Sequence, residues 1–253
     1  MNNEKCALCD QEGLLRNSHI ISDTLFDGTY DQLHRIMPIH EGEETQLRFQ
    51  QQGFREKLLC DKCEQKLSRW ENILKKELIA LDGADTNRLE IIRENGKKKV
   101  TKIAYDEFKK AILSILWRMS ICKDPFFTDY KLSKEINDSL KKAILDESKV
   151  PEQTFALIVT RIKQDDEERS KIIALFNKPT QLKEYKFISF ILYGFLFDVC
   201  VSCEIFDEKL HEIILKEDGS LTLNEKNLLE LEITAKLDSN LNSERVRKFH
   251  NLE

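Results

Sequence analysis

The sequence has no apolar run long enough to cross a membrane, and it contains little proline and glycine. Its longest uncharged apolar stretch, residues 187–197, is about half the roughly twenty residues that a spanning helix needs. The polar start of the chain is not followed by the apolar segment of a signal peptide. Four prolines and eight glycines among 253 residues exclude a collagen-like chain. We therefore expect a globular cytoplasmic protein with no membrane partner.

Neither sign of charge dominates the composition. Forty Lys and Arg residues stand against forty-five Asp and Glu residues, which gives a net charge of −5. This balance excludes a chain that coats nucleic acid over its whole surface. A local basic surface can still bind phosphates, because these contacts depend on the local potential.

Seven cysteines without an export signal argue against a disulfide framework. Four of them form two pairs, Cys6-x-x-Cys9 and Cys60-x-x-Cys63. Two such knuckles can present four thiolates to one Zn²⁺ in tetrahedral geometry. The alternative is that these cysteines are separate core thiols, but both pairs lie among polar residues. The spacing therefore predicts a structural zinc site.

The remaining cysteines differ in context. Cys200 and Cys203 lie in an apolar segment typical of a strand, where positions three apart face opposite sides of a sheet. Such a pair cannot chelate one ion, so we expect buried thiols. Cys122 stands alone.

The chain divides into two predicted parts. Residues 1–81 hold both knuckles and show poor periodicity before Cys63, which predicts a small zinc-centred module. Residues 82–253 are expected to form an α+β domain for specificity or partner binding, with helices packed on a mostly antiparallel sheet. The fold class is therefore α+β.

Hydrophobic periodicity predicts individual elements. A helix is expected from Glu64 to Asp82-Gly83, and a hairpin is expected around Asn95-Gly96. Further helices are expected at residues 108–119 and 133–145, strands at 154–162 and at 187–205 with a break at Gly194, a hairpin joining 211–216 to 220–223, and a helical tail from about residue 225.

One short motif precedes the second knuckle, and another contains it. They are Ser18-His19-Ile20-Ile21 and Leu58-Leu59-Cys60-x-x-Cys63-Glu64. With the first knuckle, they resemble the treble-clef HNH (ββα-metal) nucleases that carry a four-cysteine zinc. More narrowly, they resemble uncharacterised bacterial proteins described as HNH-like. The resemblance implies a nucleic-acid partner, a regulatory protein partner that restrains a toxic nuclease, and a setting in defence against phage.

The resemblance also implies roles for single residues. His19 matches the general base that deprotonates the attacking water. Glu64 matches a ligand of the catalytic divalent ion, and its carboxylate suits Mg²⁺ or Mn²⁺. Position 18 departs from the pattern, because Ser18 replaces the usual acidic residue. The central asparagine of the motif is also missing, and Gln50, Gln51 and Gln52 are the candidates for its place.

Other residues of the first part have plainer interpretations beside the functional ones. His19 can instead bond a backbone carbonyl or add a zinc ligand, and His34 and His40 lie in a polar loop. Glu71 lies about 10 Å along a helix from Glu64, too far to share one ion with it. We therefore expect Glu71 to be a structural partner of Arg48 or Arg55.

Cations are frequent around the second knuckle. They indicate either a surface for the phosphate backbone or an ordinary solvated helix face, and they include Arg55, Lys62, Lys66 and Arg69. Farther along, Trp117 is expected in the core, and Arg118 is expected to anchor the interface between the two parts.

Two hypotheses follow. The first is an HNH-like nuclease that uses Mg²⁺ or Mn²⁺ beside structural Zn²⁺ and cleaves DNA or RNA. The second is a non-catalytic zinc module that binds nucleic acid or a protein.

Overall fold

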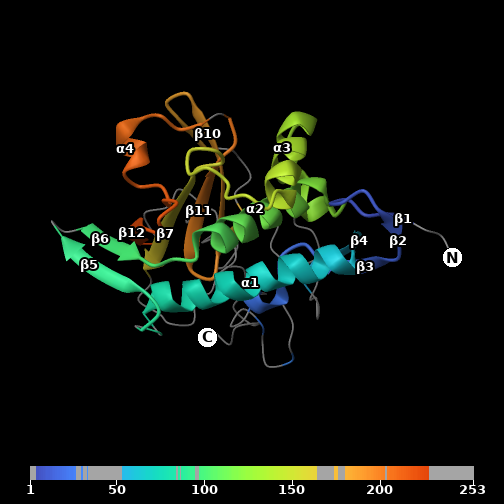
Figure 1. Cartoon of the computed structure of the whole chain (residues 1–253), viewed down its shortest axis with the longest axis horizontal. Coiled ribbons are helices and arrows are strands. Elements are labelled where there is room, and N and C mark those ends of the chain that lie inside the picture. Colours follow the sequence, from blue (N-terminus) through green and yellow to red (C-terminus); the bar gives the residue numbers. More distant parts are fainter. Residues whose placement is uncertain are drawn as a thin grey trace, which may run out of the picture.

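The structure is a computed structural model of the chain. It describes residues 4–26, 30, 33, 53–83, 85, 87–94, 97–163, 174–175, 180–202 and 204–227. Helices and a mostly antiparallel sheet make up the described part, which confirms the α+β class (Figure 1).

The cysteine-bearing part begins with two short pairs of strands. β1 (Glu4–Lys5) pairs with β2 (Glu12–Gly13), and β3 (Leu15–His19) pairs with β4 (Arg55–Cys60) in antiparallel fashion. Helix α1 (Asp61–Asp82) follows β4 without a linker. In Figure 1 these strands lie at the start of α1, so the second knuckle spans the junction of strand and helix.

Helix α1 begins three residues before the predicted start and ends where predicted. Its buried face includes Leu67, Leu74 and Leu78 at helical spacing. Gly83 closes it with a φ of 94° and donates its N–H to Ala80 O at 3.0 Å. Glycine takes this left-handed conformation without steric cost, which explains the sharp end.

The elements after α1 largely match their predictions. β5 (Glu90–Glu94) and β6 (Lys97–Thr101) pair as a hairpin, although its Asn95-Gly96 turn lies outside the described residues. Helix α2 (Tyr105–Ile121) and helix α3 (Lys134–Leu145) follow. A 3₁₀ segment, η2 (Pro125–Tyr130), connects them.

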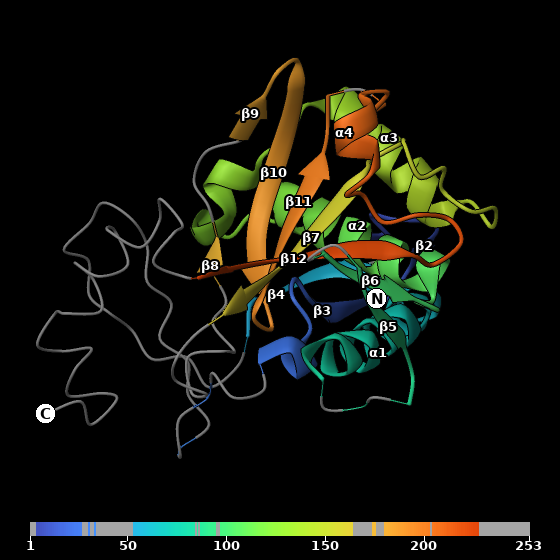
Figure 2. The same ribbon diagram turned by 90° about the vertical axis from the view of Figure 1, so that its left-hand side faces the viewer.

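The large sheet combines eight strands. Their order is β5-β6-β12-β7-β11-β10-β8, and β9 also pairs with β10. The β12–β7 pair is parallel and the other pairs are antiparallel. The strands not yet bounded are β7 (Leu157–Lys163), β8 (Ala174–Leu175), β9 (Thr180–Leu182), β10 (Tyr185–Leu192), β11 (Phe195–Cys200) and β12 (Leu221–Asn227), several of which appear side by side in Figure 2.

The two faces of this sheet pack differently. On one face the ring of Phe197 lies 6.3 Å from that of Phe108 on α2. On the other face Phe187 and Cys200 join a second apolar cluster with Leu210 of α4 (Glu208–His211). Cys200 is 1% exposed, which confirms a buried thiol, whereas Cys203 lies outside the described residues.

Three predictions near the sheet are wrong in detail. The strand predicted at 154–162 is β7, which begins at Leu157 rather than Thr154 because a turn precedes it. The segment 211–216 is not a strand partner of 220–223, since β12 pairs with β6 and β7 instead. The turn between them is real, with Gly219 N–H donating to Lys216 O at 2.9 Å. Residues 225–227 continue β12 instead of starting a helix, and 228–253 lie outside the described residues.

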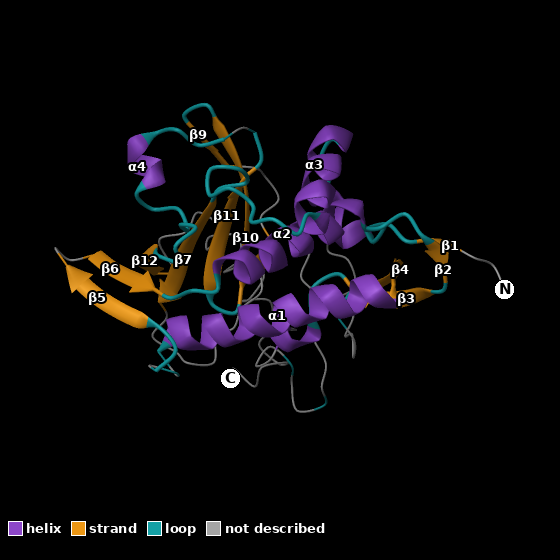
Figure 3. Cartoon of the chain, viewed as in Figure 1, coloured by secondary structure: helices purple, strands orange, loops and turns teal. Residues whose placement is uncertain are grey.

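Buried side chains run continuously across the two predicted parts. One cluster includes Leu67 of α1, Trp117 of α2 and Phe197 of β11, and Trp117 is 2% exposed as expected of a core residue. Figure 3 shows α1 and α2 side by side, with the small strands at one end and the large sheet beyond α2. The division at residue 81 remains a prediction. No helix in the described part has the length and apolarity of a membrane span.

Candidate zinc and histidine site

The two knuckles meet at one point. The Sγ atoms of Cys6, Cys9, Cys60 and Cys63 all lie within 4.8 Å of one another. Four thiols converging in this way offer the donor set of a structural zinc site. The cluster can therefore hold a zinc ion, as the spacing predicted. It is the one group of three or more cysteine, histidine or carboxylate ligands among the described residues.

Local backbone geometry shapes the first knuckle. Cys6 N–H donates to Gln11 O at 2.9 Å, and Asp10 N–H donates to Cys6 O at 3.0 Å. Asp10 takes a φ of 61°, a conformation that aspartate tolerates better than most residues. Ala7 N–H donates to Leu58 O at 2.9 Å and so fixes this turn against β4.

The cysteines differ in their ionisation. Burial disfavours the Cys6 thiolate, but N–H groups of Cys9, Cys60 and Leu8 outweigh it and lower the pKa of Cys6 to about 7. Burial and the neighbouring cysteines raise the pKa of Cys63 instead. Four crowded thiols cannot all ionise without a neutralising cation, which is the charge balance that zinc supplies.

His19 ends β3 and lies beside an aspartate that the sequence did not single out. Its Nε2 is 2.9 Å from Oδ2 of Asp23, four residues later. The ring is 24% exposed, and its covered Nε2 has this carboxylate as its ion-pair partner.

Asp23 gathers three partners at the start of the 3₁₀ segment η1 (Asp23–Phe26). Besides His19, Arg55 Nη2 donates to Oδ2 at 3.0 Å and the Tyr30 hydroxyl donates to Oδ1 at 3.1 Å. Burial works against ionisation, but the contacts with His19, Tyr30 and Arg55 prevail and lower the pKa of Asp23. The imidazole therefore lies against a carboxylate that stays ionised.

Register explains why Arg55 joins this group. His19 pairs with Arg55 across the β3–β4 ladder, so both side chains project from the same face of the hairpin. Ser18 pairs with Glu56 on the opposite face and is fully buried. Its hydroxyl lies 3.5 Å from Arg16 O. Ser18 thus points away from the face that carries His19.

Glu64 lies in the first turn of α1, one position after Cys63. Its Oε2 is buried and has no hydrogen-bond partner among the described residues, so it is not bonded to His19. His19 lies five strand residues from the Cys60 end of the hairpin, about 16 Å, whereas Glu64 lies about 6 Å along α1 from Cys60. The pairing of Glu64 with His19 around one ion stays a prediction.

Glu71 is linked to His19 through Arg118, and the prediction that it pairs with Arg55 is wrong. It is 6% exposed and pairs with Arg118 of α2, because α1 and α2 pack side by side. Arg55 is occupied by Asp23 instead. Arg48 lies outside the described residues, as do His34, His40 and Gln50–52.

The candidate phosphate-binding cations separate into two kinds. Lys66 Nζ donates to Ile144 O at 3.4 Å and to Leu145 O at 3.5 Å, and it lies 5.0 Å from the ring centre of Trp70. It thus covers the carboxyl end of α3. Lys62 and Arg69 on the same helix are exposed. Lys62, Arg69 and Arg55 are therefore the described cations near the second knuckle that are accessible to a phosphate.

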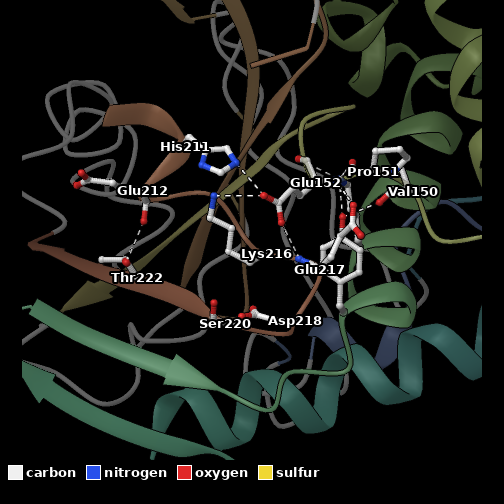
Figure 4. A network of polar contacts seen from close by, with 12 residues as sticks. Val150, Pro151, Glu152, His211, Glu212, Lys216, Glu217, Asp218, Ser220 and Thr222 are labelled. Atoms are coloured by element: carbon white, nitrogen blue, oxygen red, sulfur yellow. Dashed lines mark hydrogen bonds and ion pairs between the residues drawn. The ribbon is translucent and has the colours of Figure 1, made fainter. Parts of the chain in front are cut away.

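A second polar cluster lies on the far side of the molecule from the knuckles. Glu152 Oε1 contacts Nε2 of His211 at 2.8 Å and Nζ of Lys216 at 3.5 Å, as Figure 4 shows. Its Oε2 accepts the Glu217 N–H at 2.9 Å. Both oxygens of the Glu152 carboxylate have protein partners, so this cluster joins the loop that carries Glu152 to the segment 211–217.

Comparisons with known protein families, with curated proteins and with solved structures gave no match. The functional assignment therefore rests on the site itself: four cysteines placed to hold zinc, and a histidine–aspartate–arginine group at the other end of the same hairpin.

Proposed function

We propose that this chain is a zinc-stapled, HNH-like hydrolase of nucleic-acid phosphodiester bonds. The observation that carries the proposal is the contact of His19 Nε2 with Asp23 Oδ2 at 2.9 Å, on a hairpin fixed by the cysteine cluster. The order of parts agrees with the treble-clef arrangement, since a knuckle, a two-stranded hairpin and a helix follow one another.

Each group has a chemical role in this proposal. The His19 imidazole takes a proton from the attacking water, and the ionised Asp23 stabilises the imidazolium that results. Arg55 lies on the same carboxylate through Nη2, and the side chain is 28% exposed. Its other guanidinium donors can therefore bind a phosphate oxygen.

A divalent ion would complete the proposed site. Glu64 would be its protein ligand, because the resemblance assigns it this role and its Oε2 is buried without a hydrogen-bond partner among the described residues; the ion would then lie nearer to the Cys60 end of the hairpin than His19 does. Mg²⁺ and Mn²⁺ are commonly held by one or two carboxylates together with water and substrate phosphate. Such an ion supplies charge stabilisation at the phosphate and the leaving oxygen.

The test is cleavage by the purified full chain. Supercoiled plasmid, single-stranded DNA and RNA are incubated with Mg²⁺ or Mn²⁺, using the parent, His19→Ala and His211→Ala. His211 is a matched control, because it also contacts a carboxylate, at 2.8 Å, but in the distant loop cluster. We expect cleavage by the parent and His211→Ala and loss of cleavage in His19→Ala. Equal rates in all three would refute the role of His19.

A second candidate function is a non-catalytic zinc module that binds nucleic acid. The burial of Ser18 favours it, because the residue at the usual acidic position is fully buried and points away from the face of His19. This candidate predicts that the folded, zinc-loaded parent binds nucleic acid and cleaves none of the three substrates.

A further inference from the structure

Arg118 of α2 reaches the backbone of His19 from the other half of the chain. Its Nη1 donates to His19 O at 2.6 Å, its Nη2 pairs with Glu71 Oε1, and its Nε donates to Ser114 O at 3.2 Å. The side chain is 1% exposed. All three guanidinium nitrogens therefore have fixed partners in the protein interior.

The partners of Arg118 come from three elements. Glu71 belongs to α1, Ser114 to α2 itself, and His19 to the last position of β3. The carbonyl group of His19 lies at the end of the β3–β4 ladder, where the register stops at Arg55. Arg118 thus fixes the orientation of the peptide group that leads away from the imidazole-bearing residue.

A buried Arg–Glu pair is a costly way to gain stability. Desolvation of the two charges commonly cancels their attraction, and well-packed apolar residues of similar size often stabilise a protein as much. Such a pair does supply directed hydrogen bonds that apolar side chains cannot make. The bond to His19 O is one of these.

We propose that Arg118, held by Glu71, is a positioning residue that sets the orientation of His19 for the reaction proposed above. The inference rests on that proposed function, and it assigns to α2 a part in the site. The bond to His19 O fixes the end of β3 relative to α1 and α2. Because η1 begins four residues later, this bond also fixes the strand end from which His19 meets Asp23.

The same helix offers a matched control. Lys110 of α2 is 2% exposed, and its Nζ donates to Asp146 O at 3.0 Å and to Ser148 O at 2.9 Å. It is as buried as Arg118 and also combines carbonyl partners with an ion pair, but the carbonyl groups belong to the loop after α3 and the carboxylate is that of Asp106 on α2 itself, at 2.9 Å. Lys110→Met should cost stability without disturbing His19.

The test combines ring spectra with kinetics. The variants are R118K, the double variant R118M/E71M, which leaves no unpaired buried charge, and K110M. Long-range ¹H–¹⁵N spectra report the ring nitrogens of His19, with His211 as the internal reference. Cleavage of an oligonucleotide in Mn²⁺ gives kcat and KM, and metal analysis confirms retained zinc.

We expect R118M/E71M to fold with zinc bound, to shift the His19 ring signals and to leave those of His211 in place. Its kcat should fall on the order of 10²-fold with little change in KM, as expected when a reacting group is misplaced by about 1 Å. R118K, which keeps the charge but loses the fork, should fall between this variant and the parent.

Unchanged His19 signals and kcat in R118M/E71M would overturn the positioning role. The same holds if K110M matches its effects, because the loss would then reflect general destabilisation. If the parent cleaves nothing, the proposed hydrolase is refuted and so is the catalytic part of this inference, while the spectra still report whether Arg118 orients the ring.

Discussion

The main-chain N–H of Cys60 donates to Sγ of Cys6 at 3.3 Å, although the two residues are 54 positions apart. This bond joins the two knuckles directly. It comes from a cysteine of one pair and helps to stabilise the thiolate of the other pair, as the lowered pKa of Cys6 reflects. The two pairs therefore form one site whose parts depend on each other.

We predict one zinc ion per chain and a loss of stability when a cysteine of the cluster is replaced. Cys9→Ser should lower the zinc content and reduce the free energy of unfolding by more than about 2 kcal/mol, because metal binding is coupled to folding in such modules. Elemental analysis and denaturant unfolding measure both. Cys122→Ser is the control, since Cys122 is buried but lies outside the cluster. Full zinc content in Cys9→Ser would contradict the assignment.

We predict that Asp23→Asn lowers the catalytic rate while the fold persists. The amide has the size of the carboxylate but cannot stabilise an imidazolium, so kcat should fall on the order of 10²-fold. Asp138→Asn is the control, because Asp138 is exposed and pairs with Lys134 on α3. The measurement is kcat for cleavage by Asp23→Asn, Asp138→Asn and the parent. Equal rates for Asp23→Asn and the parent would remove Asp23 from the mechanism.

The sequence allowed the four-cysteine cluster to be predicted, because ligand spacing within a knuckle is local information. The β5–β6 hairpin and the end of α1 at Gly83 were predictable for the same reason, since a turn and a helix terminus depend on a few adjacent residues. The partners of β12 were not, because they lie on β6 and β7, far away in the chain.

The histidine site was predictable only in part. The motif around His19 pointed to the residue but not to Asp23, whose role depends on η1 bringing it back beside the imidazole. An acidic residue four positions after a candidate base, next to a short turn, was the available signal. The place of Arg118 on an apolar helix indicated a role at an interface. Its partners Glu71 and His19 could not be predicted, because they depend on how α1, α2 and β3 pack.

We predict that stability rises with pH above neutrality because of Lys109. Burial lowers the pKa of Lys109 to about 7, although Glu217, Glu152 and Asp106 act to raise it. Its Nζ donates to Pro151 O at 2.7 Å and lies 3.1 Å from the Tyr105 hydroxyl. The unfolded chain keeps a lysine pKa near 10.4, so it binds more protons than the folded chain between about pH 7 and 10.

This excess makes the free energy of unfolding increase with pH across that window, by at most about 1.4 kcal/mol per pH unit. Below about pH 7 the contribution is constant. The measurement is urea unfolding at several values between pH 7 and 9, for the parent and Lys109→Met. The parent should gain stability relative to the variant as the pH rises. A difference that does not change with pH would show that Lys109 is protonated throughout.

We predict that replacing Lys62 and replacing Lys66, which lie four positions apart on α1, affect different properties: the first weakens nucleic-acid binding and the second lowers stability. Lys62 is exposed and free to meet a phosphate, so Lys62→Met should weaken nucleic-acid binding and reduce the slope of log K against log [salt] by about 0.9 for duplex DNA. Lys66 is bonded to carbonyl groups at the end of α3, so Lys66→Met should cost about 1 kcal/mol of stability and leave the slope unchanged.

Salt-dependent binding titrations and denaturant unfolding of the two variants separate these outcomes. Each variant is the matched control for the other, because both remove one lysine from the same helix. If Lys66→Met changed the salt slope as much as Lys62→Met does, the side chain would leave α3 to reach the ligand. If neither changed it, the phosphate backbone would not pass along the first turns of α1.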